Sequence, residues 1–196
     1  EESLLTDSLE ATNEFYALAK ITGIKLCEAL KKQHNFNSIC LMPTNLYGPN
    51  DNFDYETSHV LPALIRKFHD AKVNKKTNVV VWGNGTPLRE FLYLDDFIDS
   101  CFFTMNINKK FLEEKSIDLN YVNVGSGNEI SIIELAQLIK KIVKFKGKIK
   151  LDPSKPNGSL RKFLDTTKIR KLGWKPKVSL INGLSKTYEN FKNTSL

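Results

Sequence analysis

Apolar residues recur along much of the chain at intervals of three and four, the spacing that places them on one face of a helix. Between these stretches lie short apolar runs, which are typical of buried strands. The alternation of strand and helix predicts an α/β fold with a parallel sheet. The expected helices span residues 13–33, 60–73, 95–105, 131–144, 165–173 and 180–191, and the expected strands span residues 38–41, 78–82, 121–124 and 149–151.

Polar residues at the ends of these stretches fit helix caps. Ser131 and Glu134 have the spacing of a capping box. Asp95-Asp96 and Asp165 are candidate N-caps, since an aspartate accepts the free N–H groups of a first turn. The strand at 38–41 runs into a segment rich in Pro, Asn and Gly, which we expect to be a loop.

A complete dinucleotide-binding fold opens with a strand, a glycine-rich turn and a helix. The chain has no Gly-x-Gly-x-x-Gly or Gly-x-x-Gly-x-x-Gly run. The pairs Gly83/Gly85 and Gly125/Gly127 follow expected strands, but neither has a third glycine. Either the fold is a different one, or its first half lies outside these residues.

Composition narrows the class of protein. The chain has 196 residues, 41% hydrophobic and 26% charged, which is ordinary for a globular protein. The net charge of +7 comes from lysines scattered among acidic residues, without a basic motif interleaved with aromatic residues. We therefore expect no nucleic-acid partner. No apolar run approaches the roughly 20 residues of a membrane span, so we expect no membrane partner.

The three cysteines lie inside apolar segments. Cys27, Cys40 and Cys101 have spacings that match no metal site. We expect buried thiols, no bound metal and a cytoplasmic protein.

Tyr16 and Lys20 carry the candidate chemistry. On a helix, residues four apart point to the same face. A tyrosine with an ordinary pKa of about 10 is a poor acid–base group at neutral pH, and a neighbouring cation favours the phenolate. A ketone reduced by hydride needs a proton on its developing alkoxide, which Tyr16 could supply.

Tyr188 and Lys192 repeat the same spacing, so spacing alone decides nothing. Either pair could be an ordinary surface contact. Two features favour the first pair. Ala17 and Ala19 leave room for a bulky planar cofactor, and a buried strand and a Pro/Asn/Gly loop follow at once. A polar tail follows Tyr188.

Several longer strings resemble the GDP-L-fucose synthase family of the extended short-chain dehydrogenase/reductase superfamily. Tyr-x-x-x-Lys marks only the superfamily. Pro-Thr-Asn-Leu-Tyr-Gly-Pro and Trp-Gly-x-Gly-Thr-Pro-x-Arg-Glu-Phe are far narrower. The resemblance runs from about residue 12 to the C-terminus and rests on residues 16–28, 42–53, 58–69, 79–91 and 154–158.

The resemblance implies an NADP(H)-dependent enzyme that epimerises GDP-4-keto-6-deoxy-D-mannose at C3 and C5 and then reduces C4. Tyr16 would be the proton donor of the reduction, and Lys20 would bind the nicotinamide ribose. His59 would be a general acid in epimerisation and would lie at the cofactor. The residues implied to line the cofactor are Pro43, Thr44, Asn45 and Leu46.

The resemblance also implies a set of residues that hold the GDP-sugar. Arg89 and Lys67 suit diphosphate oxygens, although a structural ion pair and a solvated helix face are their ordinary alternatives. Trp82 offers a stacking surface or could belong to the core. Asn157 stands where we would expect an aspartate. Lys162 is a weaker phosphate candidate.

As a member of this family, the chain would form the C-terminal part of a Rossmann-type doubly wound parallel sheet, with a small α/β substrate domain. Residues 1–54 and 91–126 would belong to the cofactor domain, and residues 55–90 and 127–196 to the substrate domain. The resemblance implies a homodimer through the helix of Tyr16. The family's phosphate-binding glycines, catalytic serine and epimerase cysteine belong to a part that these residues do not include.

Two other functions remain open at the level of sequence. One is a GDP-sugar 4-ketoreductase without epimerisation, for instance on a heptose. The other is a non-catalytic sugar-nucleotide-binding module with a vestigial Tyr/Lys pair.

Overall fold

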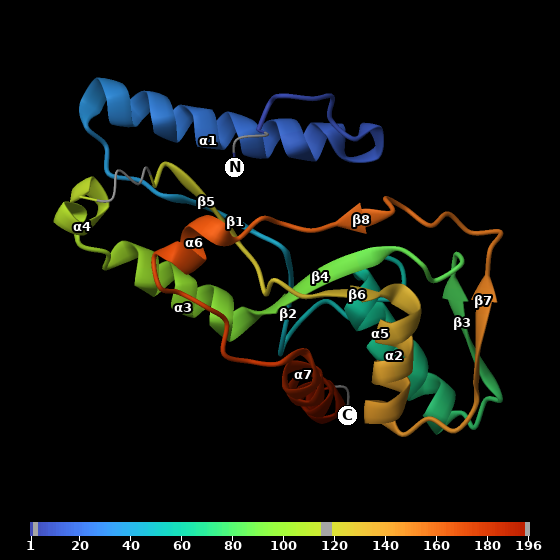
Figure 1. Ribbon diagram of the computed structural model, residues 1–196. Helices are drawn as coiled ribbons and strands as arrows, with labels where there is room; N and C mark the ends of the chain where they lie inside the picture. The colour runs from blue at the N-terminus through green and yellow to red at the C-terminus, as the bar shows by residue number, and fades with distance from the viewer. Residues whose placement is uncertain (2–3, 115–118, 195–196) are drawn as a thin grey trace. The chain divides into compact units, whose positions relative to one another are not determined.

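The computed structural model describes residues 1, 4–114 and 119–194 and shows an α/β protein, as the sequence predicts (Figure 1). After a short 3-10 helix (Ala11–Asn13), the helices are α1 (Glu14–His34), α2 (Val60–Val73), α3 (Leu94–Met105), α4 (Lys109–Glu114), α5 (Ile132–Val143), α6 (Thr167–Lys171) and α7 (Leu180–Thr194). The strands are β1 (Cys40–Pro43), β2 (Asn45–Tyr47), β3 (Asn78–Trp82), β4 (Leu88–Tyr93), β5 (Tyr121–Val124), β6 (Glu129–Ser131), β7 (Lys148–Asp152) and β8 (Arg161–Lys162).

The chain divides into two compact units, and each is described by itself. The first unit comprises residues 1–43, 98–124 and 165–175, and the second comprises residues 44–97, 125–164 and 176–196. The domain boundaries inferred from the sequence stay a prediction.

The first unit is built around the parallel pair β1–β5. Cys40 lies opposite Tyr121 and Pro43 lies opposite Val124 in this ladder. The side chain of Val124 is fully buried. The short helix α6 packs on β5, and Lys168 Nζ donates a hydrogen bond of 3.3 Å to the carbonyl oxygen of Tyr121. This pairing confirms the parallel arrangement expected for the strand at 121–124.

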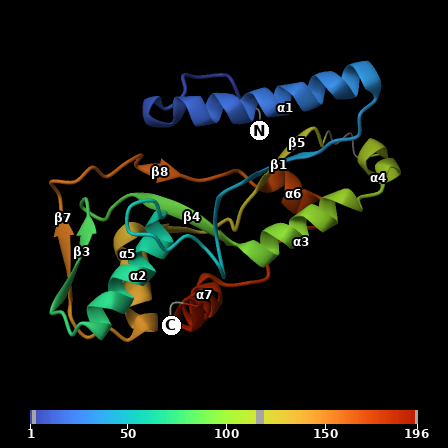
Figure 2. The same ribbon diagram turned by 180° about the vertical axis from the view of Figure 1, so that it is seen from behind.

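In the second unit, β4 is the central strand of a small mixed sheet. β2 and β8 pair with it in parallel and β6 pairs with it in the antiparallel direction. A separate parallel pair joins β3 to β7. The core lies where α2 and α5 pack against each other, side by side in both views (Figures 1 and 2). Its fully buried side chains include Leu61, Ile65 and Phe68 of α2 and Leu135 and Ile139 of α5.

The capping box at the start of α5 is confirmed. The backbone N–H of Glu134 donates to Ser131 Oγ at 3.3 Å, and the backbone N–H of Ser131 donates to Glu134 Oε2 at 3.0 Å. These two bonds satisfy donors that the first turn would otherwise leave free. The helix therefore begins where the sequence predicts.

The capping role expected for Asp95 and Asp96 is wrong, because α3 already begins at Leu94 and places both residues inside its first turn. The buried carboxylate of Asp96 instead accepts the backbone N–H groups of Lys177 and Val178, each at 3.0 Å. The N-cap of α6 is Thr166, so the N-cap predicted at Asp165 is wrong by one residue. Asp165 Oδ1 still accepts the backbone N–H of Thr167, the first residue of α6, at 2.8 Å.

The expected loop at 43–49 is partly wrong, because it contains β2. The expected strand at 38–41 is displaced and occupies Cys40–Pro43. The strands β4, β6 and β8 and the helix α4 were not predicted. In β4 the charged residues Arg89 and Glu90 interrupt the apolar run, which hides the strand from a hydrophobic pattern.

Cys27, Cys40 and Cys101 are free thiols and half-buried rather than fully buried. Burial raises the pKa of Cys40 to about 11, and a contact with the Cys27 thiol acts in the same direction. The Cys40 thiol is therefore protonated at neutral pH and poorly reactive. Among the residues that the structure describes, no helix is both long and apolar enough to cross a membrane.

Candidate active site

Tyr16 and Lys20 lie on α1 with their side chains together. Lys20 Nζ is 5.4 Å from the centroid of the Tyr16 ring. The Tyr16 side chain is 62% exposed, and no residue of α1, all of which the structure describes, is buried. The phenol is therefore not part of a packed core in this unit.

The second Tyr/Lys pair has a different environment. Lys192 Nζ is also 5.4 Å from the Tyr188 ring, but Tyr188 is buried in the core of the second unit. Its hydroxyl lies 3.2 Å from His69 Nδ1, and Lys192 forms an ion pair of 2.7 Å with Glu189. Burial raises the pKa of Tyr188, which disfavours its phenolate. This pair has a structural role.

The segment from Pro43 to Leu46 leads from β1 into β2. Pro43 is the last residue of β1 in the first unit, and Thr44 opens the second unit. Thr44 Oγ1 and Asn45 Nδ2 donate hydrogen bonds of 3.1 and 2.7 Å to the same acceptor, the backbone carbonyl oxygen of Glu90. The segment is thus fixed to β4 through side chains, and Leu46 continues the parallel β2–β4 ladder.

His59 occupies the N-cap position of α2. Its backbone is extended and its side chain makes no capping hydrogen bond, which leaves the exposed imidazole outside the helix. Asp51 lies near enough to interact with it. Burial raises the pKa of Asp51, while its hydrogen bond with the Asn52 N–H and the charge of His59 oppose this shift. Sequence reasoning missed Asp51, which has no motif of its own.

Trp82 carries cations over its ring. Its side chain is 59% exposed, so it does not belong to the core. Lys67 Nζ lies 4.9 Å and Lys155 Nζ 5.7 Å from the centroid of the Trp82 ring, within cation–π range. Burial lowers the pKa of Lys67. Lys155 was not among the sequence candidates, because the Lys-Pro-Asn-Gly sequence to which it belongs indicates a turn and no particular function.

Arg89 lies against the same turn. An added Cβ at Gly158 would be 3.4 Å from Arg89 Nη2, so the guanidinium lies beside the turn. Asn157 Oδ1 accepts the backbone N–H of Asn84 at 2.8 Å, which anchors the turn to the end of β3. Lys162 lies opposite Arg89 in the β4–β8 ladder. Burial lowers the pKa of Arg89, which stays charged at neutral pH.

The five sequence candidates for the GDP-sugar therefore gather in one unit. Lys67 lies over the Trp82 ring, Asn157 is hydrogen-bonded to Asn84 in the loop after β3, and Lys162 lies opposite Arg89 in the β4–β8 ladder. Tyr16, Lys20 and Pro43 belong to the first unit, and the structure describes the two groups separately. Within residues 1, 4–114 and 119–194, no cluster of His, Cys, Asp and Glu could hold a metal ion.

Comparison with known proteins identifies the family of this chain. Residues 1–120 match the NAD dependent epimerase/dehydratase family. The chain belongs to this family. Its members use a nicotinamide cofactor by the family's own description, which agrees with the exposed Tyr/Lys pair on α1.

One relative of the chain is GDP-L-fucose synthase 1 of Arabidopsis thaliana, which is 56% identical to it over 189 residues. That alignment covers 96% of this chain and 56% of the plant protein. The chain thus spans about half the length of the curated relatives it matches. The resemblance inferred from the motifs is confirmed.

Two solved structures have the same fold. A GDP-6-OMe-4-keto-L-xylo-heptose reductase from C. jejuni is 34% identical with a TM-score of 0.89, covering 98% of this chain and 64% of that one. A GDP-L-fucose synthetase from Naegleria fowleri bound to NADP is 30% identical with a TM-score of 0.86, covering 99% and 60%. Both likenesses support the α/β fold predicted from sequence.

Proposed function

We propose that this chain is part of an NADP(H)-dependent enzyme that converts GDP-4-keto-6-deoxy-D-mannose to GDP-L-fucose. It would act by epimerisation at C3 and C5 followed by reduction at C4. The observation that carries the proposal is the exposed Tyr16 phenol with the Lys20 ammonium beside it. They lie in a chain 56% identical to a GDP-L-fucose synthase.

Reduction at C4 uses Tyr16 as the proton donor. The cofactor, when bound, supplies the hydride to the carbonyl carbon. The Tyr16 hydroxyl gives its proton to the C4 oxygen as negative charge develops there, and the product leaves as an alcohol. Lys20 would stabilise the resulting phenolate, and it would hold the ribose of the cofactor by donating hydrogen bonds.

Epimerisation uses His59 as an acid. Removal of a proton beside the C4 ketone gives an enolate, and a proton returned to the opposite face inverts the carbon. Histidine is the side chain that most often serves as a general acid or base in enzymes. Asp51, which interacts electrostatically with His59, would help to orient the ring.

The GDP-sugar would be held by the residues that gather in the second unit. Arg89 presents a planar fork suited to two diphosphate oxygens, and Lys67 presents a point charge. The exposed face of Trp82 suits an apolar or stacking contact with the nucleotide. Lys162 lies opposite Arg89 in the β4–β8 ladder, and Asn157 precedes Gly158, beside which the Arg89 guanidinium lies. Asn157 and Lys162 complete the proposed substrate residues.

The residues present fit one end of a nicotinamide nucleotide. An exposed phenol and an ammonium on α1 suit the nicotinamide and its ribose. Thr44 and Asn45, both hydrogen-bonded to the backbone carbonyl oxygen of Glu90, form a separate set of proposed cofactor residues in the second unit. The proposed cofactor residues are Lys20, His59, Pro43, Thr44, Asn45 and Leu46.

We also propose that the whole protein is a cytoplasmic homodimer through α1, whose apolar side chains Phe15, Leu18 and Leu26 are exposed.

Product analysis of the full-length protein in deuterated water tests this function. The protein is incubated with GDP-4-keto-6-deoxy-D-mannose and NADPH, and the product is analysed by NMR and mass spectrometry. We expect GDP-L-fucose that carries solvent deuterium at C3 and C5. The C4 carbon should carry no solvent deuterium, because its hydrogen comes from NADPH. Absence of any reduced product would contradict the proposal.

A second candidate is a GDP-sugar 4-ketoreductase without epimerisation. The likeness to the C. jejuni GDP-6-OMe-4-keto-L-xylo-heptose reductase, with a TM-score of 0.89, favours it. The same experiment separates the two. A reduced product that carries no deuterium at C3 and C5 would replace the epimerase by the ketoreductase.

A further inference from the structure

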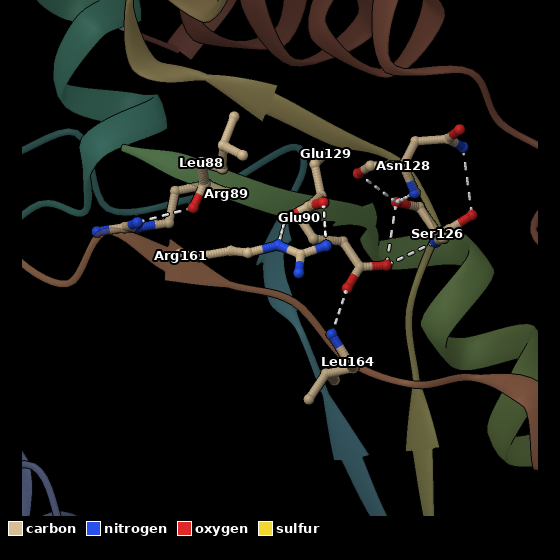
Figure 3. A network of polar contacts seen from close by, with 9 residues as sticks. Leu88, Arg89, Glu90, Ser126, Asn128, Glu129, Arg161 and Leu164 are labelled. Atoms are coloured by element: carbon tan, nitrogen blue, oxygen red, sulfur yellow. Dashed lines mark hydrogen bonds and ion pairs between the residues drawn. The ribbon is translucent and has the colours of Figure 1, made fainter. Parts of the chain in front are cut away.

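Glu90, in the middle of β4, is a fully buried carboxylate that holds two distant loops (Figure 3). Its Oε1 accepts the backbone N–H of Gly127 at 2.6 Å and the hydroxyl of Ser126 at 3.4 Å. Its Oε2 accepts the backbone N–H of Leu164 at 3.3 Å. All three partners are donors, so both carboxylate oxygens act as acceptors.

The loop after β5 is shaped around this carboxylate. Gly125 has no room for a side chain, because an added Cβ would collide with the Glu90 carboxylate. Gly127 has a φ of +74°, a conformation that L side chains rarely adopt. These two requirements explain the Gly-Ser-Gly sequence. Backbone N–H groups of such loops commonly bind phosphate or carboxylate anions, and here a carboxylate of the chain itself occupies that role.

The same residue also fixes the proposed cofactor segment. The backbone carbonyl oxygen of Glu90 accepts both the Thr44 hydroxyl at 3.1 Å and the Asn45 side-chain amide at 2.7 Å. Glu90 therefore ties residues 44–45, which follow β1 in the chain, to residues 126–127, which follow β5. In parallel α/β sheets, ligands bind beside the loops that follow the carboxyl ends of strands.

We propose that Glu90 is a positioning residue of the cofactor site: its buried carboxylate fixes the backbone at residue 90 and thereby the orientation of Thr44 and Asn45. This inference rests on the proposed function, since it assigns residues 43–46 to the cofactor. Glu90 itself touches neither cofactor nor substrate. Because the segment is held before the ligand arrives, binding does not have to order it.

Glu90→Gln in the full-length protein tests the role. A glutamine offers one oxygen and one N–H₂ group, so one of the two N–H donors, Gly127 or Leu164, would face another donor. The NADPH dissociation constant is measured by fluorescence titration and the GDP-sugar KM at saturating NADPH. We expect the NADPH dissociation constant to rise about tenfold. This corresponds to the free energy of roughly one hydrogen bond, the one that Glu90 no longer makes to its loop. The GDP-sugar KM should change less than about twofold.

Glu129→Gln is the matched control. Glu129 lies opposite Glu90 in the β4–β6 ladder, and its carboxylate pairs with Arg161 at 2.6 Å on the surface. This change removes a carboxylate next to Glu90 without touching the Thr44–Asn45 segment. We expect NADPH binding as in the wild type.

If Glu90→Gln does not fold, Gly125→Ala acts on the same carboxylate from the loop side and should raise the NADPH dissociation constant in the same direction. Wild-type affinity for NADPH in a folded Glu90 or Gly125 variant overturns the positioning role, as do equal rises in the NADPH and GDP-sugar constants. A wild-type protein that neither binds NADPH nor reduces a GDP-4-keto sugar contradicts the proposed function instead.

Discussion

Lys20 holds its ammonium nitrogen 5.4 Å from the centroid of the Tyr16 ring, and both side chains are exposed on α1. The pair Tyr188/Lys192 has the same distance but a buried ring bound to His69. The two pairs share spacing and geometry and differ in burial. Burial therefore distinguishes the exposed Tyr16 phenol from the Tyr188 phenol, which supports the core.

Arg89 tests the proposed diphosphate contact. Arg89→Lys keeps the charge and loses the planar fork, so two parallel hydrogen bonds become one. We expect the GDP-sugar KM to rise about tenfold with a smaller change in kcat. Steady-state kinetics on the full-length protein measure this. Arg161→Lys, on the paired strand β8, is the control and should leave the GDP-sugar KM near the wild-type value. An unchanged KM in Arg89→Lys would contradict the placement of Arg89 in the substrate site.

The capping box of α5 predicts a stability effect. Ser131→Ala removes the hydroxyl that accepts the Glu134 N–H at the start of a core helix. We expect the free energy of unfolding to fall by about 1 kcal/mol, measured by urea denaturation. Ser185→Ala, at an exposed position within α7, should change it by less than about 0.5 kcal/mol. Equal effects of the two substitutions would show that the cap does not stabilise the protein more than an exposed serine does.

Two helical glycines should respond in opposite directions to alanine. Gly183 of α7 is buried, and an added Cβ would collide with the hydroxyl of Tyr47, so Gly183→Ala should lower stability by about 1–3 kcal/mol. Gly23 of α1 has nothing within 4 Å, so Gly23→Ala should raise it by up to about 1 kcal/mol. Thermal and urea unfolding measure both. A stabilising Gly183→Ala would mean that Tyr47 moves without cost.

His69 predicts how stability depends on pH. Burial lowers its pKa from the ordinary 6.5, so the unfolded chain binds this proton more readily than the folded one. The free energy of unfolding should therefore fall as pH drops below about 6.5 and level off below the folded pKa. Urea unfolding at several pH values should show a weaker decline between pH 7.5 and 5.5 in His69→Gln than in the wild type. Identical slopes would exclude a contribution from His69.

Local signals in the sequence were enough to find much of the fold. The helix at 60–73 and the strand at 78–82 have clean periodicity and were predicted at their observed bounds. The Ser131/Glu134 cap is a contact between residues three apart, which a sequence displays directly.

Long-range contacts were not available from the sequence. β4 was missed because Arg89 and Glu90 interrupt its apolar pattern, and only the fold shows that Glu90 is buried against a loop 36 and 37 residues away. Asn157 meets Asn84 across 73 residues for the same reason. Such pairings depend on how strands are arranged, which spacing along the chain does not encode.

The central claim is that Tyr16 donates the proton in reduction, and Tyr16→Phe in the full-length protein tests it most directly. The rate of NADPH oxidation by GDP-4-keto-6-deoxy-D-mannose is measured under single-turnover conditions, with Tyr188→Phe as the matched control. We predict a rate lowered by about 10²–10⁴-fold in Tyr16→Phe with NADPH still bound, and a rate near that of the wild type in folded Tyr188→Phe. A wild-type rate in Tyr16→Phe would contradict the account.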